Sequence, residues 1–330
     1  MIISSCVGAV EISFSELLSI IAYHTGLSDS KSFLPQQAAV FLSLRLPRVL
    51  LGVLVGAALG ISGAAIQGLF RNPLAEPSLI GISSGATLFA VMMIVLELSV
   101  FNALTGLLGF YALSVAAFIG AGITTMIVYR IAMKNGKTAI TTLLLTGIAI
   151  NALAGSFTGL LTYLATDAQL RNITFWGLGS LGGASWNTVS SLLPFVLLPV
   201  LTLPFLAKAL NGFVLGESQA LHMGINTKLV KKLIIILSTM AVGASVAVAG
   251  MIGFIGLIIP HILRMIFTAD LRLVIPGSAL LGGALLTAAD LVARTLVAPA
   301  ELPIGILTAM IGCPVFIYII ISDRSKNKLI

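Results

Sequence analysis

The sequence predicts an all-α protein that crosses a membrane about nine times, and three observations support this fold class. Of its 330 residues, 58% are hydrophobic and 9% are charged, whereas soluble domains carry about 25% charged residues. The charged residues leave eight long uncharged stretches between them, and almost all of these reach the ~20 apolar residues that a helix needs to span a bilayer. The stretches are continuously apolar, unlike the ~10-residue alternating segments of a transmembrane β-barrel.

Turn residues and charges divide these stretches into nine predicted membrane helices. In chain order they cover residues 49–70, 77–96, 105–129, 138–162, 188–207, 229–249, 252–268, 273–294 and 303–322. Residues 165–186 contain two tryptophans and four glycines, a composition typical of a connection at the membrane surface. No linker or low-complexity segment separates independent units, so we expect one transmembrane domain over residues 1–330.

The basic residues predict the orientation of these helices. A multi-pass chain keeps most of its Lys and Arg on the cytoplasmic side, and a cytoplasmic carboxyl terminus places 13 basic residues inside and five outside. The inner residues are Arg71, Arg130, Lys134, Lys137, Lys208, Lys228, Lys231, Lys232, Arg264, Arg272, Arg324, Lys326 and Lys328. The outer residues are Lys31, Arg45, Arg48, Arg171 and Arg294. Since orientation explains the net charge of +7, nucleic-acid binding is a poor interpretation of it.

One inner segment, residues 211–226, is too polar to span the membrane. Its composition predicts one or two short surface helices, and Gly224 is the residue type that closes a helix at its carboxyl end.

The sequence lacks the residue patterns of an enzyme or a metal site. Its three histidines, His24, His222 and His261, have no Asp, Glu or Cys at ligand spacing. The two cysteines, Cys6 and Cys313, are too few and too far apart to predict a disulfide framework or a zinc site. We therefore expect no metal and no cofactor.

A nucleotide site is also not predicted. Residues 136–138 imitate the end of a phosphate-binding loop, but Ile131 stands where that loop needs a glycine. The chain therefore needs an external source of energy if it transports a cargo uphill.

Charges at membrane depth are scarce. Asp290 and Arg294 lie four residues apart on one helix face, where they can pair with each other. Ion-coupled secondary transporters usually place acidic groups near the membrane midplane, and Asp290 is the only such candidate. A secondary transporter remains the alternative from a different functional class.

Several long motifs resemble those of the FecCD/BtuC-like permease subunits of type II ATP-binding-cassette importers, which take up iron chelates, haem or vitamin B12. In the first half these motifs are Arg45-Leu46-Pro47-Arg48 and the segments at 55–63, 67–77 and 81–86. In the second half they occupy residues 250–264, 300–306 and 312–316.

The resemblance implies a homodimer or paired permease in the bacterial cytoplasmic (inner) membrane. Two cytoplasmic ATP-binding subunits and an external substrate-binding protein would be its partners, besides membrane lipid. Residues 175–186 look more like the haem and ferric-siderophore branch than the vitamin B12 branch. The expected cargo is therefore an iron complex, with vitamin B12 as the alternative within the family.

The resemblance also implies two functional surfaces. Coupling to the ATP-binding subunit would use Gly216, Glu217, Ala220, Leu221, Met223 and Gly224; the alternative is an amphipathic loop on the membrane surface. Docking of the binding protein would use Arg45 and Arg294, which match arginines that meet acidic residues in the family, and the neighbouring outer Arg48. The alternatives are an internal pair with Asp290 for Arg294 and a lipid-headgroup anchor for Arg48.

The amino terminus departs from the family, which has ten membrane helices with both termini inside. Residues 1–12 look like the outer end of a first helix, but ten or so residues cover only ~15 Å of a ~30 Å hydrocarbon core. We therefore expect a truncated first helix, from a late start codon or a shortened chain. The alternative is a nine-helix protein whose amino terminus is translocated without a signal peptide.

Overall fold

A computed structural model describes residues 1–8, 10–27, 32–96, 108–134, 137–138, 140–297 and 300–326, and almost all of the elements in it are helices. The elements before the first long connection are α1 (Ile2–Cys6), α2 (Phe14–His24), α3 (Pro35–Val40), the π-helix η1 (Phe41–Arg45), α4 (Leu46–Phe70), the 3-10 helix η2 (Pro77–Ile80) and α5 (Ile82–Leu96). A second group comprises the 3-10 helix η3 (Gly109–Tyr111), α7 (Ala112–Ala132), β1 (Met133–Lys134), β2 (Lys137–Thr138), α8 (Ile140–Leu164) and α9 (Asp167–Gly177). The remaining helices are α10 (Trp186–Val214), α11 (Glu217–His222), α12 (Thr227–Ala249), α13 (Ile255–Ile266), α14 (Leu271–Thr295) and α15 (Ile304–Lys326).

The predicted fold class is confirmed, and each predicted span corresponds to a helix. Six helices in the described part of the chain are long and apolar enough to cross a membrane: 35–70, 112–132, 140–164, 186–214, 227–249 and 271–295. The spans predicted at 77–96, 252–268 and 303–322 contain the shorter apolar helices α5, α13 and α15. With 12 residues, α13 covers only ~18 Å at helical rise, so nine complete crossings is an approximate count.

Two predicted boundaries change in the structure. The helix that begins the 49–70 span starts instead at Pro35, because the π-helix at 41–45 joins α3 to α4 without a break. The 77–96 span is divided at Gly81, whose φ of 89° lies in the left-handed region that glycine adopts without strain. Residues 105–107 of the third predicted span lie outside the described residues.

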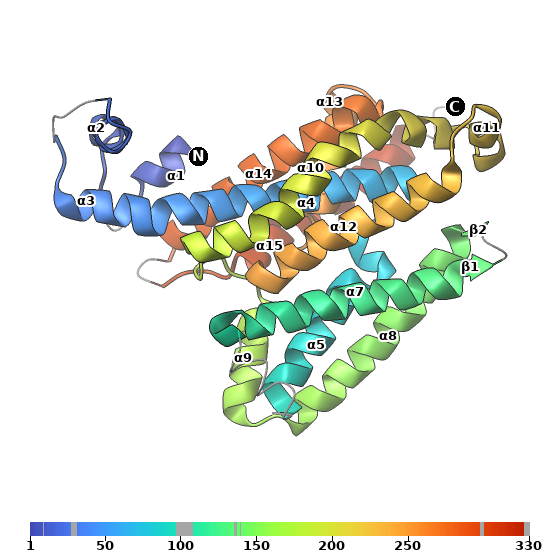
Figure 1. Ribbon diagram of the computed structural model, residues 1–330, viewed down its shortest axis with the longest axis horizontal. Coiled ribbons are helices and arrows are strands. Elements are labelled where there is room, and N and C mark those ends of the chain that lie inside the picture. Colours follow the sequence, from blue (N-terminus) through green and yellow to red (C-terminus); the bar gives the residue numbers. More distant parts are fainter. Residues whose placement is uncertain are drawn as a thin grey trace.

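Figure 1 shows the long helices running roughly along one direction, with different elements gathered at the two ends. The helices α2, α3 and α9 lie toward one end, which the sequence analysis assigns to the outer side. The short helix α11, the β1–β2 hairpin and the carboxyl terminus lie toward the other end. The elements predicted to lie outside and those predicted to lie inside are therefore at opposite ends, and the orientation itself stays a prediction.

Helix α4 occupies the centre of the larger helix group and contacts α10, α12, α13 and α14. A Cβ atom on Gly56 would collide with the backbone of Gly282 and Gly283, and one on Gly60 would collide with the carbonyl of Ser278. Glycine at these positions lets the backbones of α4 and α14 approach closely, as small residues do in membrane helices. The glycines spaced four apart in this span therefore serve helix packing.

The helices α5, α7 and α8 form a second group, which α12 joins to the first by contacting both α5 and α7. Figure 1 shows this group beside the α4-centred helices. Gly147 on α8 packs against the carbonyl of Leu79, but most of α8 is exposed. Its exposed face therefore has no covering element among the described residues.

The amino-terminal residues form a short helix rather than a span. Five residues, Ile2–Cys6, make up α1, which contacts α4, η1 and α14. The expectation of a truncated first helix stays a prediction.

Candidate functional site

The inner-end segment at 211–226 holds one separate helix, α11, where one or two were expected. Residues 211–214 instead continue α10, which ends at Val214. Gly216 precedes α11 with a φ of 111° and Gly224 follows it with a φ of 80°, both values that favour glycine. The N–H of Ile225 donates to the carbonyl of Ala220 at 3.1 Å, so Gly224 closes the helix as predicted.

An ion pair fastens α11 to α12. Lys231 Nζ lies 2.6 Å from Glu217 Oε1, and the Lys231 side chain is only 3% exposed. Thr227 Oγ1 donates to the same carboxylate oxygen at 3.3 Å. The side chains of Glu217, Thr227 and Lys231 therefore link α11 to α12 directly, in addition to the connecting loop.

Exposed apolar side chains lie on and beside α11, next to its exposed polar residues Ser218, Gln219 and His222. Leu221 is 52% exposed and Met223 is 61% exposed, and Val214 and Leu215 at the end of α10 are 68% and 63% exposed. Ala220, by contrast, is fully buried, so it holds α11 against the body of the protein. Exposed apolar side chains gathered in this way are typical of a protein interface.

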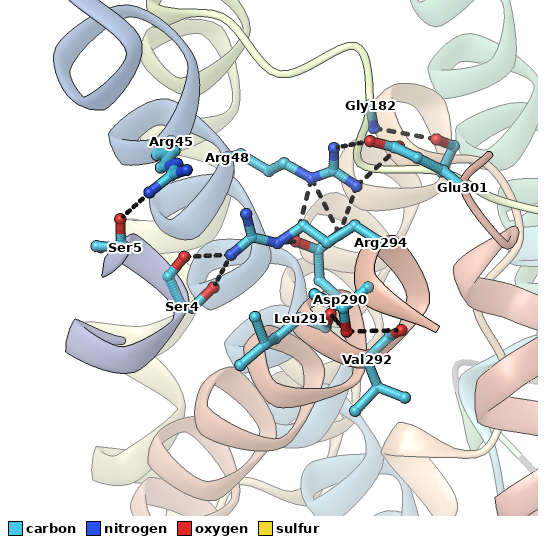
Figure 2. A network of polar contacts seen from close by, with 12 residues as sticks. Ser4, Ser5, Arg45, Arg48, Gly182, Asp290, Leu291, Val292, Arg294 and Glu301 are labelled. Carbon is cyan, nitrogen blue, oxygen red and sulfur yellow. Dashed lines mark hydrogen bonds and ion pairs between the residues drawn. The ribbon is translucent and has the colours of Figure 1, made fainter. Parts of the chain in front are cut away.

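A network of polar contacts lies at the opposite end of the bundle (Figure 2). Arg48 Nη2 on α4 lies 2.9 Å from Asp290 Oδ1 on α14. Its Nη1 lies 2.8 Å from Glu301 Oε1 in the loop before α15. One guanidinium therefore connects α4, α14 and that loop.

The network also supplies ion-pair partners for Asp290, the only acidic residue that the sequence analysis placed at membrane depth. The Asp290 side chain is 3% exposed, and Arg294 Nε lies 3.8 Å from its Oδ2. The expected pairing of Asp290 with Arg294 is thus the longer of its two ion pairs. The shorter one, with Arg48, gives that residue an internal partner in place of the lipid headgroup considered for it.

The other two predicted docking arginines bind the amino-terminal segment. Arg45 is 5% exposed, and its Nη1 donates to the carbonyls of Ser5 and Cys6, each at 2.8 Å. Arg294 Nη2 donates to the carbonyl of Ser4 and, at 3.0 Å, to its Oγ. Figure 2 shows Ser4 and Ser5 on the helix that faces these two guanidinium groups.

The structure thus brings Arg45, Arg48 and Arg294 together, but it does not leave them equally accessible. Contact of Arg45 or Arg294 with an external acidic residue requires exchange of their bonds to the amino-terminal segment. The side chain of Glu301, at 46% exposed, is the most accessible of the side chains that form these ion pairs. Its hydrogen bond from Arg48 holds the pKa of this carboxyl below its ordinary value of 4.5.

A polar cavity of about 330 Å³ lies between the start of α5, α8 and the loop before α13, and the sequence analysis did not identify it. Asn151 Nδ2 donates to the carbonyl of Ser78 at 3.0 Å, and Ser84 Oγ donates to Asn151 Oδ1 at 2.5 Å. The residues that line the cavity are Ser78, Ser83, Ser84, Thr87, Asn151, Gly155, Thr158 and Met251. A helical spacing of polar and small residues on α8 was the available signal, since Asn151, Gly155 and Thr158 are four and three residues apart.

The exposed face of α8 combines apolar and small residues. Leu153, Phe157 and Leu160 are each at least 50% exposed. A Cβ on Gly155 or Gly159 would meet no atom within 4 Å. Two glycines that lie four residues apart on an exposed membrane helix, with open space beside them, are typical of a surface that packs against another helix.

No group of three or more His, Cys, Asp and Glu side chains able to hold a metal ion occurs in the described residues. Cys6 and Cys313 are both free thiols.

Comparisons with known proteins identify the relatives of this chain. A model of the FecCD transport family matches residues 1–322. The hemin transport system permease protein HmuU of Yersinia pestis is 44% identical over 329 residues, which cover 98% of this chain and 92% of that protein. The vitamin B12 import system permease protein BtuC of Escherichia coli O9:H4 (strain HS) is 40% identical over 309 residues, covering 93% of this chain and 91% of the relative.

A solved structure has the same architecture. An ABC transporter of the metal-chelate type in an inward-facing conformation is 31% identical to this chain and superimposes with a TM-score of 0.83. The match covers 97% of this chain and 94% of that one.

Proposed function

The chain belongs to the FecCD transport family, and we propose that it is the membrane-spanning permease subunit of an ABC importer for an iron complex. The single observation that carries this proposal is the similarity over 98% of the chain to a hemin permease. The six long apolar helices agree with a passage through a membrane. The chain is accordingly a multi-pass membrane protein that works as a transport subunit.

The coupling role falls to α11 in this proposal. An ATP-binding subunit needs a contact surface on the permease. Leu221 and Met223 present exposed apolar side chains at the α11 end of the bundle. Closure of the ATP-binding subunits would move α11, and the ion pair between Glu217 and the buried Lys231 would pass that movement to α12. Gly216 and Gly224 form the turns on either side of α11. The buried Ala220 packs α11 against the rest of the protein.

The outer network is the proposed docking surface of the binding protein. Acidic residues on that protein would compete with Glu301 for Arg48, and with the amino-terminal carbonyls for Arg45 and Arg294. We propose that the carboxyl terminus lies on the cytoplasmic side of the bacterial inner membrane, at the same end as α11 and opposite the docking surface. The distribution of basic residues supports this orientation.

The exposed face of α8 is the proposed contact with a second permease copy. Two copies packed through Gly155 and Gly159 would bring their α8 helices close together. The polar cavity borders the same helix at Asn151 and Thr158, so we propose that it belongs to the path of the cargo. Labelling of Thr158→Cys by a water-soluble thiol reagent tests this assignment, and a cysteine that never reacts during turnover contradicts it.

The proposed identity of the cargo rests on the relatives of this chain and not on a charged pocket. An iron complex, as haem or a ferric siderophore, is favoured because the hemin permease is 44% identical, compared with 42% and 40% for two cobalamin (vitamin B12) permeases. Vitamin B12 remains the second candidate, since that difference is small. The ligand retained by the binding protein that docks on this permease distinguishes the two.

Co-purification tests the partnership. We expect a tagged chain to retain an ATP-binding subunit, and we expect Leu221→Asp/Met223→Asp to lose it while still inserting in the membrane. Leu27→Asp is a matched control, because Leu27 is 81% exposed near the opposite end of the chain's helix bundle. Retention of the ATP-binding subunit by the double variant would contradict the assigned coupling surface.

A further inference from the structure

A groove between α7 and α12 is not used by the proposed transport function. It has a volume of about 450 Å³, within the range of about 300–1,000 Å³ of pockets that hold small ligands. Apolar residues supply most of its wall, among them Phe118, Met126, Ile236 and Met240. Met126 is 56% exposed and Ile236 is 48% exposed, so the groove opens on the outside of the bundle.

Two cations stand at one end of this groove. Arg130 lies in the last turn of α7, and Lys232 lies in the second turn of α12; both line the groove and both are exposed. The ion pairs found among the described residues involve neither of them. No Asp or Glu occurs among the lining residues, all of which are described. The two positive charges therefore lack a compensating anion within the groove.

A buried hydroxyl also points to an absent ligand. Thr125 lines the groove, is 3% exposed, and its Oγ1 has no hydrogen-bond partner among the described residues. A buried polar atom without a partner costs about 1–3 kcal/mol. The groove thus combines a long apolar wall, one unsatisfied hydroxyl and two cations at the membrane-surface end of the helices.

We propose that this groove is a binding site for an anionic phospholipid, with an acyl chain along the apolar wall and the headgroup phosphate between Arg130 and Lys232. Basic pockets between membrane helices are known to select anionic headgroups. The opening toward the exterior of the bundle gives a lipid direct access. The two positive charges favour a headgroup of net negative charge over a zwitterionic one, in which a cationic group offsets the phosphate.

The groove can be filled without disturbing the helices that form it. Gly122 lines it, and a Cβ on this residue would meet no atom within 4 Å. Gly122→Leu therefore places a side chain where the acyl chain would lie. Arg130→Gln/Lys232→Gln removes two charges at exposed positions. The double variant should therefore fold like the wild type, because neither change alters core packing.

Native mass spectrometry of the full chain, delipidated and purified with the subunits that remain bound, tests the site. The probes are dioleoyl-phosphatidylglycerol and dioleoyl-phosphatidylcholine, which differ in headgroup charge but not in acyl chains. Each basic group near an anionic headgroup contributes about a fivefold change in affinity. We therefore expect the wild-type chain to prefer phosphatidylglycerol by about 25-fold.

The variants separate the two parts of the site. Arg130→Gln/Lys232→Gln should abolish the preference between the two lipids, and Gly122→Leu should weaken the binding of both. Lys208→Gln is the matched control, because Lys208 is an exposed lysine on α10 that does not line the groove; it should keep the wild-type preference.

Equal affinity of the wild-type chain for both lipids, or an unchanged preference in the double variant, would overturn the proposal. Displacement of the lipid by inorganic phosphate at equal concentration would reduce the site to a phosphate site and would also overturn it.

Discussion

Arg48 on α4 and Asp290 on α14 form an ion pair of 2.9 Å between residues 242 positions apart in the chain. The pair joins two helices that pack closely through glycine, and Glu301 extends it to the loop before α15. The Asp290 side chain is 3% exposed and also lies 3.8 Å from Arg294. The pair therefore fixes the outer ends of α4 and α14 relative to each other.

Removal of Arg48 should destabilise the protein. Arg48→Met leaves a buried carboxylate with Arg294 at 3.8 Å as its remaining ion-pair partner, and loss of one member of a buried pair costs about 3–5 kcal/mol. We expect a lower melting temperature in detergent for Arg48→Met, and partial recovery in Arg48→Met/Asp290→Asn because the second change removes the orphaned charge. Arg171→Gln, at an exposed position on α9, should melt like the wild type. A double variant that melts below both single variants would argue against this pairing.

Acid should weaken the outer network at Glu301. Its pKa lies below 4.5 in the folded protein because of the hydrogen bond from Arg48. A carboxyl with a lowered pKa contributes stability above its unfolded value, and that contribution is lost as the pH falls through the folded value. The difference in melting temperature between the wild type and Glu301→Gln should therefore shrink from pH 6 to pH 3. A difference that grows toward acid would contradict a stabilising role for the ionised carboxylate.

The packing of α4 against α14 predicts opposite results for two Gly→Ala changes. A Cβ on Gly56 would collide with the backbone of Gly282, whereas one on Gly122 would meet open space. We expect Gly56→Ala to cost about 1–3 kcal/mol, as overpacking does. Gly122→Ala should be neutral or stabilising by up to about 1 kcal/mol, because alanine favours a helix over glycine. Equal melting temperatures for the two variants would show that α4 and α14 are packed less closely.

Thiol cross-linking tests the proposed contact between two α8 helices. In a chain with Cys6→Ser and Cys313→Ser, a cysteine in place of Gly159 should cross-link two copies with a short bifunctional reagent, because residues near a two-fold axis face their own symmetry mates. Gly122→Cys is the control, since it is an equally open glycine on a different helix. Cross-linking of Gly122→Cys but not of Gly159→Cys would place the second copy elsewhere.

The sequence predicted the elements whose composition is decisive over a long stretch. All nine spans were located because apolar residues run without charge for the length of a membrane helix, and α11 was located because it interrupts that pattern. The start of the first span was wrong because Arg45 and Arg48 were interpreted as flanking charges. Both lie within a continuous helix, where carbonyls and carboxylates from distant segments accept their hydrogen bonds.

Contacts between distant segments were not predictable. The link between Arg48 and Glu301 joins residues 253 positions apart, and only helix packing brings them together. The polar cavity was missed because each serine or threonine in it is ordinary on a membrane helix and becomes informative only beside Asn151. Ala220 was predicted to be part of the coupling surface. It is buried and packs α11 against the rest of the protein, which only the packed structure reveals.

Uptake into proteoliposomes tests the central claim most directly. Vesicles would contain the chain with its ATP-binding subunit, and the haem-loaded binding protein would be added outside. We expect haem to accumulate only with ATP inside, and accumulation to be abolished by Leu221→Asp/Met223→Asp but not by Leu27→Asp. Haem uptake that needs neither internal ATP nor the ATP-binding subunit, and that follows an imposed ion gradient instead, would contradict the assignment and favour a secondary transporter.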